Sequence, residues 1–245
     1  QAADLPGPRE LGRVLGPVVE RGHLQVVAFD GPAATFLDEL GITGRYPDVA
    51  GDFIGVTTSN AGASKIDLFL ERAIGYEVDW DPSTGALRAT ATITLTNTAP
   101  DSGLPRYVIG NALGARLGEE ELPDGWNLTF LTFYTPWDHS EARLDGEPVD
   151  LERIDELGRR ALSTFVAIPP GGSRTLVVSL EGVLAESDYR LDVGAQPLVE
   201  PEVATIEIRI AGGGALQERG PLEASEGRAS GRFRLTRDTV VTVRR

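Results

Sequence analysis

The loop from Asn60 to Asp67 contains the residues best suited to bind a ligand. Asn60 and Gly62 tolerate left-handed backbone angles, which lets successive backbone N–H groups converge on an anion. Lys65, the only lysine in the sequence, would place a compact ammonium beside them, and Asp67 would orient it. The other interpretation is a structural turn, in which Lys65 and Asp67 pair with each other or with the backbone. We take Asn60, Gly62, Lys65 and Asp67 as the candidate ligand-binding residues.

Nucleophilic catalysis is disfavoured by the scarcity of histidine. A serine nucleophile needs a histidine base, and only His23 and His139 are present. His139 lies between Asp138 and Ser140, but adjacent residues of an extended chain point to opposite sides. The two histidines also lack the spacing of a zinc site. We therefore predict no catalytic residue, no metal ligand and no cofactor.

Carboxylates gather in two segments, 119–124 and 145–152, and the Asp79–Asp81 pair flanks Trp80. Calcium takes several oxygen ligands, and loops of secreted sandwiches sometimes supply them. No complete calcium-binding loop is present, so solvated loop charge is the default interpretation and calcium binding is left open.

Aromatic residues offer a second kind of ligand surface. Trp80, Trp126 and Trp137, with Phe133 and Tyr134, could include an exposed platform for sugar rings. Aromatic side chains in strands mostly belong to the core, which is the alternative for each of them.

Charge and composition restrict the class of partner. The chain has 245 residues, 41% of them hydrophobic, with a net charge of −14 and no cysteine. Such a globular, acidic chain repels nucleic acid and anionic lipid surfaces. No apolar run approaches the roughly 20 residues that span a bilayer. Because the chain begins with Gln1, we expect a signal or membrane anchor to lie outside it.

The first 73 residues predict a small α/β unit. Apolar residues at helical spacing predict a helix over 9–21, which Pro17 should kink or shorten. Residues 23–29 and 53–58 read as strands. A second helix is expected between Asp30, a plausible N-cap, and Gly41.

From Ile74 onward the hydrophobic pattern has a period of two. Leu87 to Leu95 alternate with Arg88 to Thr96, which predicts a strand with one buried face. Asp145-Gly146 predicts a tight hairpin, and residues 169–172 should join two further strands as another. Residues 151–157 are either one helical turn or a charged loop.

The resulting architecture is mainly β. We predict an immunoglobulin-like antiparallel β-sandwich over 74–183, preceded by the α/β unit 1–73. Short strands in 184–245 predict a second small β unit packed on the sandwich.

Several short segments, in this order, resemble the C-terminal part of the bacterial domain-of-unknown-function 4012 family, which is common in actinobacteria. The segments are His23 to Val26, Leu40 to Gly44, Asn60 to Asp67, Tyr76 to Val78, Thr94 to Pro100 and Gln196 to Val199. The resemblance implies a secreted or membrane-anchored envelope protein with an upstream α/β portion and transmembrane segment. It implies no reaction, so no catalytic residue is carried over.

These observations favour an extracytoplasmic, non-catalytic binding or scaffolding region of a bacterial cell-envelope protein. Cell-wall glycan or another envelope protein would be its partner. The alternative is enzymatic: the Asn60 to Asp67 loop would join an upstream portion to complete an active site for a phosphate-bearing envelope precursor.

Overall fold

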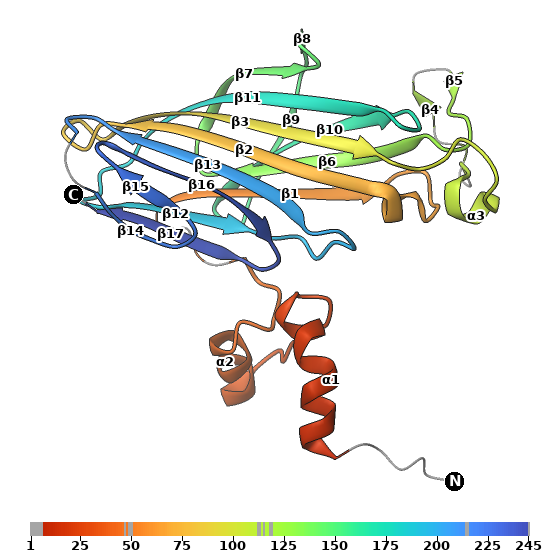
Figure 1. Cartoon of the computed structure of the whole chain (residues 1–245), viewed down its shortest axis with the longest axis horizontal. Coiled ribbons are helices and arrows are strands. Elements are labelled where there is room, and N and C mark those ends of the chain that lie inside the picture. Colours follow the sequence, from red (N-terminus) through yellow and green to blue (C-terminus); the bar gives the residue numbers. More distant parts are fainter. Residues whose placement is uncertain are drawn as a thin grey trace.

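Two β-sheets pack face to face as a sandwich, and two helices project from it in the computed structural model (Figure 1). The structure describes residues 7–46, 48, 51–111, 114, 116–117, 120–213 and 216–244. The helices are α1 (Pro8–Glu20), α2 (Gly31–Glu39), the short α3 (Arg106–Ile109) and the 3₁₀ helix η1 (Ile66–Phe69).

Sheet A has seven strands in the order β14-β17-β12-β1-β6-β10-β9. Their bounds are β1 Asp52–Asn60, β6 Asn127–Thr135, β9 Glu152–Glu156, β10 Arg159–Ile168, β12 Tyr189–Gly194, β14 Gln217–Arg219 and β17 Thr239–Arg244.

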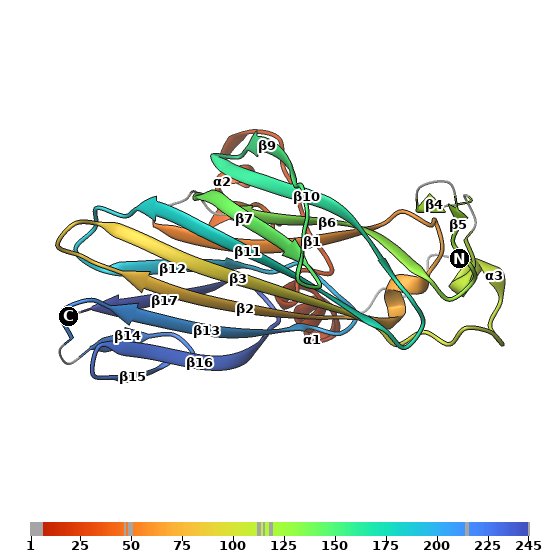
Figure 2. The same ribbon diagram turned by 90° about the horizontal axis from the view of Figure 1, so that it is seen from above.

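Sheet B has eight strands in the order β15-β16-β13-β2-β3-β11-β7-β8. Their bounds are β2 Leu70–Trp80, β3 Ala86–Asn97, β7 Asp138–Leu144, β8 Glu147–Pro148, β11 Ser173–Val183, β13 Glu202–Ile210, β15 Glu223–Ser225 and β16 Arg228–Leu235. The short pair β4 (Arg116–Leu117) and β5 (Glu120–Glu121) lies with η1 and α3 at one end of the sandwich (Figure 2).

Alternating side chains build the core between the sheets. In β3, Leu87, Ala89, Ala91, Ile93 and Leu95 are buried, as the period of two predicted. The inward side chains of β2 and β13 meet them, with those of β1, β6 and β12 from sheet A. The prediction of a mainly β sandwich is confirmed.

Pairs between strands of the segment 74–183 are antiparallel, as predicted, whereas two pairs that reach outside this segment are parallel. Strand β1 runs parallel to β12, and β2 runs parallel to β13. Alternation along a strand identifies its buried face but not its neighbour, so the sequence pattern could not reveal these pairings.

The turn at residues 169–172 is also corrected. It contains the expected tight turn, in which the Gly172 N–H bonds to the Pro169 carbonyl. However, β10 and β11 lie in different sheets, so the turn is a crossover and not a hairpin. The Gly171 N–H donates to the Asn97 carbonyl, which ties the crossover to the end of β3. The other predicted hairpin is confirmed, because Asp145 and Gly146 have positive φ angles between β7 and β8.

Two local predictions are wrong because the pairing partner of a segment is not determined by its own residues. Residues 23–29 form no strand; within them, Val26 donates one backbone hydrogen bond to Ile42. Residues 152–156 form edge strand β9, not a helical turn or loop, because β10 offers an open edge. Separately, helix α1 continues past Pro17 to Glu20, so the proline does not shorten it.

Strands from all three predicted segments share the two sheets. Strand β1 from 1–73 pairs with β6 of 74–183 and with β12 of 184–245. The division at 73/74 and 183/184 stays a sequence prediction.

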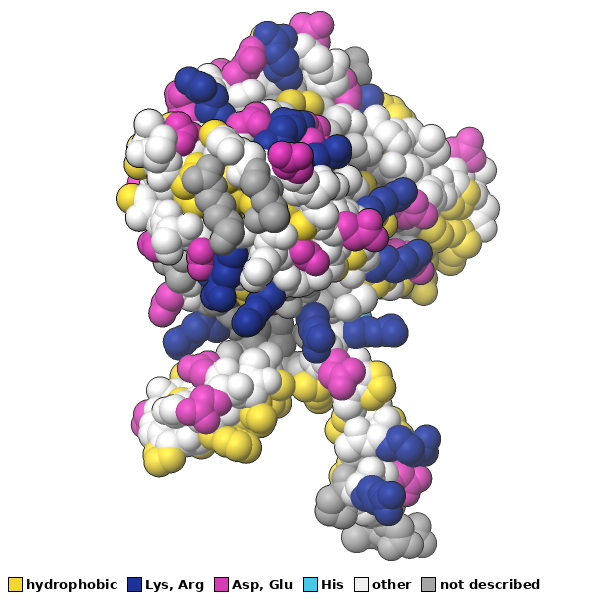
Figure 3. All heavy atoms as spheres, turned by 60° about the vertical axis from the view of Figure 1, so that its left-hand side comes forward, with side chains coloured by type: hydrophobic (Ala, Val, Ile, Leu, Met, Phe, Trp, Pro, Cys, Tyr) yellow, Lys and Arg dark blue, Asp and Glu magenta, His cyan; other side chains and the backbone are white. Residues whose placement is uncertain are grey.

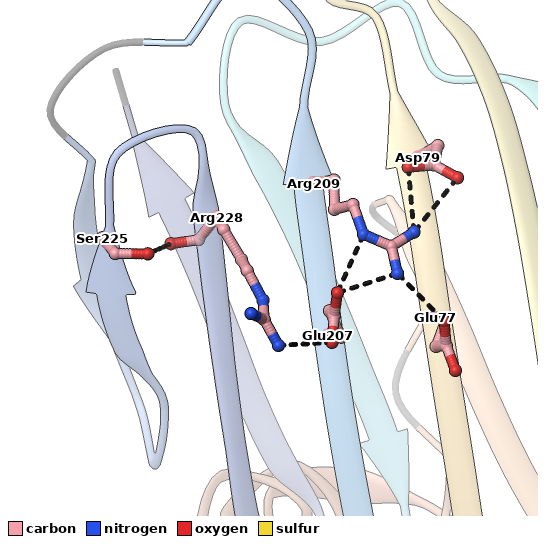
Figure 4. Close-up of polar contacts among 6 residues, drawn as sticks. All are labelled: Glu77, Asp79, Glu207, Arg209, Ser225 and Arg228. Atoms are coloured by element: carbon pink, nitrogen blue, oxygen red, sulfur yellow. Dashed lines mark hydrogen bonds and ion pairs between the residues drawn. The ribbon is translucent and has the colours of Figure 1, made fainter.

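An ion-pair network crosses the outer face of sheet B and supports the parallel pairing (Figure 4). Arg209 on β13 reaches Glu77 and Asp79 on β2, at 3.0 and 3.2 Å, and also pairs with Glu207. Arg228 on β16 contacts Glu207 at 2.6 Å. These exposed pairs align three neighbouring strands, and each contributes little stability by itself.

Candidate functional site

The 60–67 loop connects β1 to η1 at the end of the sandwich. The Lys65 backbone N–H lies 3.1 Å from the carbonyl oxygens of both Tyr107 and Val108, which fixes the loop against α3. Ile66 is buried with Ala99 and Ile109 in a small separate cluster. The loop is therefore held by backbone bonds and by one apolar anchor.

Three of the four predicted residues meet in this loop. The Asp67 carboxylate accepts hydrogen bonds from the side-chain amides of Asn60, at 3.3 Å, and Asn127, at 2.9 Å. The Asn60 amide oxygen accepts a bond from the Gly62 N–H at 2.7 Å. Burial raises the pKa of Asp67, and the Asn127 and Asn60 amides partly oppose that rise. Sequence reasoning missed Asn127 because it lies 60 residues from Asp67 along the chain, and only the fold brings the two together.

Lys65 does not join this cluster. Its side chain is exposed and forms no ion pair with a described residue. It also lines none of four cavities found along the described chain. The structure thus brings Asn60, Gly62 and Asp67 together and leaves Lys65 in solvent. Ligand binding by the four residues stays a prediction.

A buried carboxylate that sequence reasoning missed joins the two sheets. Asp52 on β1 has no exposed surface and accepts bonds from the Tyr76 hydroxyl, at 2.9 Å, and the Trp137 indole, at 2.6 Å. The Tyr189 hydroxyl and the Phe53 N–H complete the donors. Burial raises the pKa of Asp52 to about 6, although all four donors lower it. Its donors surround it, so its role is structural.

A second buried polar group lies between the sheets. Arg72 on β2 pairs with Glu202 on β13 at 2.6 Å, and neither side chain is exposed. Arg72 also donates to the Gln196 amide oxygen at 2.8 Å. A sequence signal existed, because Arg72 and Glu202 occupy the inward positions of alternating strands whose other inward residues are almost all apolar.

Two cavities lie between the helical segment, residues 7–46, and the edge of the sandwich. These cavities, of about 630 and 410 Å³, share Gly41, Gly44, Asp238, Thr239 and Val240. Such volumes are in the range of ligand sites at junctions between units.

The segment is anchored to the sandwich by one aromatic residue. Tyr46 packs edge-on against Phe53, with ring centroids 5.3 Å apart, and against Tyr134, at 5.7 Å. The Arg159 guanidinium lies 4.1 Å from the centre of the Phe53 ring. Beyond this anchor, no described side chain of the segment is buried.

Exposed apolar side chains are concentrated on this helical segment (Figure 3). Phe29 is 98% exposed and Phe36 is 58% exposed. The other exposed large apolar residues of the segment are Val14, Leu15, Val18, Leu24, Val26, Val27 and Leu40. Monomeric proteins rarely leave a large apolar surface uncovered, so this segment is a candidate interaction surface.

The aromatic and acidic residues are the remaining candidate sites. Trp80, Trp137 and Phe133 are buried core residues, whereas Trp126 and Tyr134 are partly exposed. Among described residues, no group of three or more acidic, histidine or cysteine side chains is placed to hold a metal. Glu119 lies outside the described residues. Within the described part of the chain, no helix combines the length and apolar character that crossing a bilayer requires.

Comparisons with known proteins identify no family. No family model matches the chain, and no curated protein matches it. Among solved structures, a candidate nutrient binding protein from Legionella pneumophila covers 79% of this chain and 71% of its own, with 7% identity and a TM-score of 0.42. An M1 zinc metallopeptidase from Deinococcus radiodurans covers 71% of this chain, with 9% identity and a TM-score of 0.37. This chain spans only 42% of that metallopeptidase.

Proposed function

We propose that this chain is a non-catalytic binding or scaffolding region of an extracytoplasmic bacterial cell-envelope protein of the domain-of-unknown-function 4012 family. In this proposal, the helical segment 7–46 binds another envelope protein. The observation that carries it is the exposure of that segment. Apart from the anchor Tyr46, which is partly buried, it buries no described side chain, and it presents Phe29 and Phe36 to solvent.

Helix energetics support the same proposal. Helix α1 has 13 residues, and isolated helices of that length are marginal in water. Leu11, Val14, Leu15 and Val18 form the apolar stripe that a surface helix buries against a neighbour. Helices of this kind gain most of their stability from a partner that covers the stripe.

The enzymatic alternative requires an open pocket that contains the Lys65 ammonium. The exposed Lys65 lines none of the four cavities described above, and Asp67 bonds to amides instead. Binding is therefore the function that we put forward.

The experiment is site-specific photo-crosslinking in intact cells of the source bacterium. A photoreactive residue replaces Phe36 or Phe29, and Val183, which is 68% exposed at the end of β11, is the matched control. We expect one discrete crosslinked protein from the two helical positions and none from Val183, with the product in the envelope fraction.

Three outcomes would overturn the proposal. They are equal crosslinking at Val183, crosslinks only within the same polypeptide, and recovery of the protein solely from the cytoplasm.

A further inference from the structure

The outer face of sheet A carries side chains in rows across its strands. Register places Ser59, Phe130 and Phe165 in one row across β1, β6 and β10. The neighbouring row holds three hydroxyl residues and a carboxylate: Thr57, Thr132, Ser163 and Glu152. Rows on one face are about 7 Å apart, since alternate residues share a face.

Both ends of this face are covered by other parts of the chain. At one end, Tyr46 packs on Phe53 and Tyr134. At the other, Leu122 and Trp126 pack over the next row beyond Phe165. The uncovered middle is a bounded surface, which we call the Phe130–Phe165 patch: Thr57, Ser59, Phe130, Thr132, Ser163 and Phe165.

The patch combines an aromatic surface with hydroxyl groups. Phe165 is 55% exposed although it lies in the interior of β10, and its ring centroid is 4.9 Å from that of Phe130. Thr132 and Ser163 are recessed beside the rings, with their hydroxyl oxygens 2.9 Å apart. The Ser59 side chain is exposed and makes no side-chain hydrogen bond with a described residue.

We propose that this patch binds uncharged sugar rings of a glycan, an inference that names a second partner for the binding function proposed above. The apolar C–H face of a pyranose ring stacks on Phe165 and Phe130, while its hydroxyls bond to Ser59 and Thr57. Glu152 is the charged residue of the hydroxyl row, and the whole chain carries a net charge of −14. Both disfavour anionic polymers, so the sugar is neutral.

The test measures binding of three neutral tetrasaccharides, from chitin, cellulose and mannan, to the whole chain by calorimetry and by NMR. We expect at least one to bind at millimolar concentration or below. Phe165→Ala should weaken that binding about tenfold or more, because truncation removes the stacking surface. Ser59→Arg, at an exposed position, should block the patch without affecting folding.

Tyr107→Ala is the matched control, since Tyr107 is an exposed aromatic residue, 68% accessible, on α3 and is not one of the patch residues. It should leave the affinity unchanged. The inference is overturned if none of the three sugars binds, or if Phe165→Ala and Ser59→Arg bind as well as the unmodified chain. Crosslinking at Phe36 does not depend on the patch, so either proposal can fail without the other.

Discussion

The indole N–H of Trp137 donates a 2.6 Å hydrogen bond to the carboxylate of Asp52 inside the sandwich. Trp137 follows β6 of sheet A, and the same carboxylate accepts a bond from Tyr76 on β2 of sheet B. One buried carboxylate thus connects the two sheets directly. Its substitution should therefore lower the stability of the whole fold.

Asp52→Ala should lower the free energy of unfolding by about 3 to 5 kcal/mol. The change leaves the buried donors of Tyr76, Tyr189 and Trp137 without an acceptor. A buried donor without a hydrogen bond lowers the stability of the folded state. Urea unfolding measures the effect. Asp155→Ala, at an exposed position of β9, is the control and should change stability by under about 1 kcal/mol. A similar small effect at Asp52 would contradict the structural role of its carboxylate.

The pH dependence of stability should carry the signature of Asp52. Its pKa is raised to about 6 in the folded chain, from 3.8, so the folded state binds this proton more tightly than the unfolded state. The resulting stabilisation is complete below pH 3.8 and is lost as the pH rises through about 6, a difference of about 3 kcal/mol.

Asp67, Glu202 and Asp238 also have raised pKa values, so the effect of Asp52 must be isolated by difference. Urea unfolding of the unmodified chain and of Asp52→Asn is compared across this pH range. Relative to Asp52→Asn, the unmodified chain should lose stability as the pH rises. A constant difference, or a gain, would refute the assignment.

Glu202→Ala should destabilise the fold by about 3 to 5 kcal/mol, because it leaves the Arg72 guanidinium buried without its counter-charge. Chemical unfolding again provides the measurement. Glu200→Ala is the control: Glu200 lies 3.6 Å from Arg234 on the surface, where a pair is worth about 0 to 1 kcal/mol. Replacing Arg72 and Glu202 together by Met and Leu should restore much of the loss. If the double variant is no more stable than Glu202→Ala, the unpaired buried charge of Arg72 is not the cause of the destabilisation.

Tyr46→Ala should release the helical segment while leaving the sandwich intact. The edge-on contacts of Tyr46 with Phe53 and Tyr134 are its aromatic anchor. Trypsin should then cleave faster at Arg21 and Arg45, followed by mass spectrometry, while the main thermal transition stays close to that of the unmodified chain. Phe36→Ala, at an exposed site, should change neither. Unchanged cleavage in Tyr46→Ala would show that other contacts hold the segment.

The sequence predicted the sandwich because alternation records which side of a strand is buried. Leu87 to Leu95 show this clearly. The hairpin at Asp145-Gly146 could also be predicted, because it depends on the backbone preferences of these two residues alone. Partner choice is not local, so the parallel pairing of β1 with β12 and the crossover at Gly171 could not be predicted. The predicted strand at 23–29 failed for the same reason, since no neighbouring strand pairs with it.

The candidate site was predicted in part. The loop with Asn60, Gly62 and Asp67 could be found from residue types, but Asn127, which also donates to Asp67, comes from the distant strand β6. Arg72 and Glu202 were detectable as charges at inward positions of apolar strands. Phe130 and Phe165 became neighbours only through strand register, which residue patterns do not specify.

Hydrogen–deuterium exchange of the isolated chain tests the central claim most directly. That claim is that the helical segment 7–46 finds its stabilising partner elsewhere. We predict that the amides of α1 and α2 exchange within seconds, while those of β1 and β12 in the centre of sheet A stay protected for hours or longer. Protection of α1 and α2 equal to that of the sheets would contradict the claim, since the segment would then be stable without a partner.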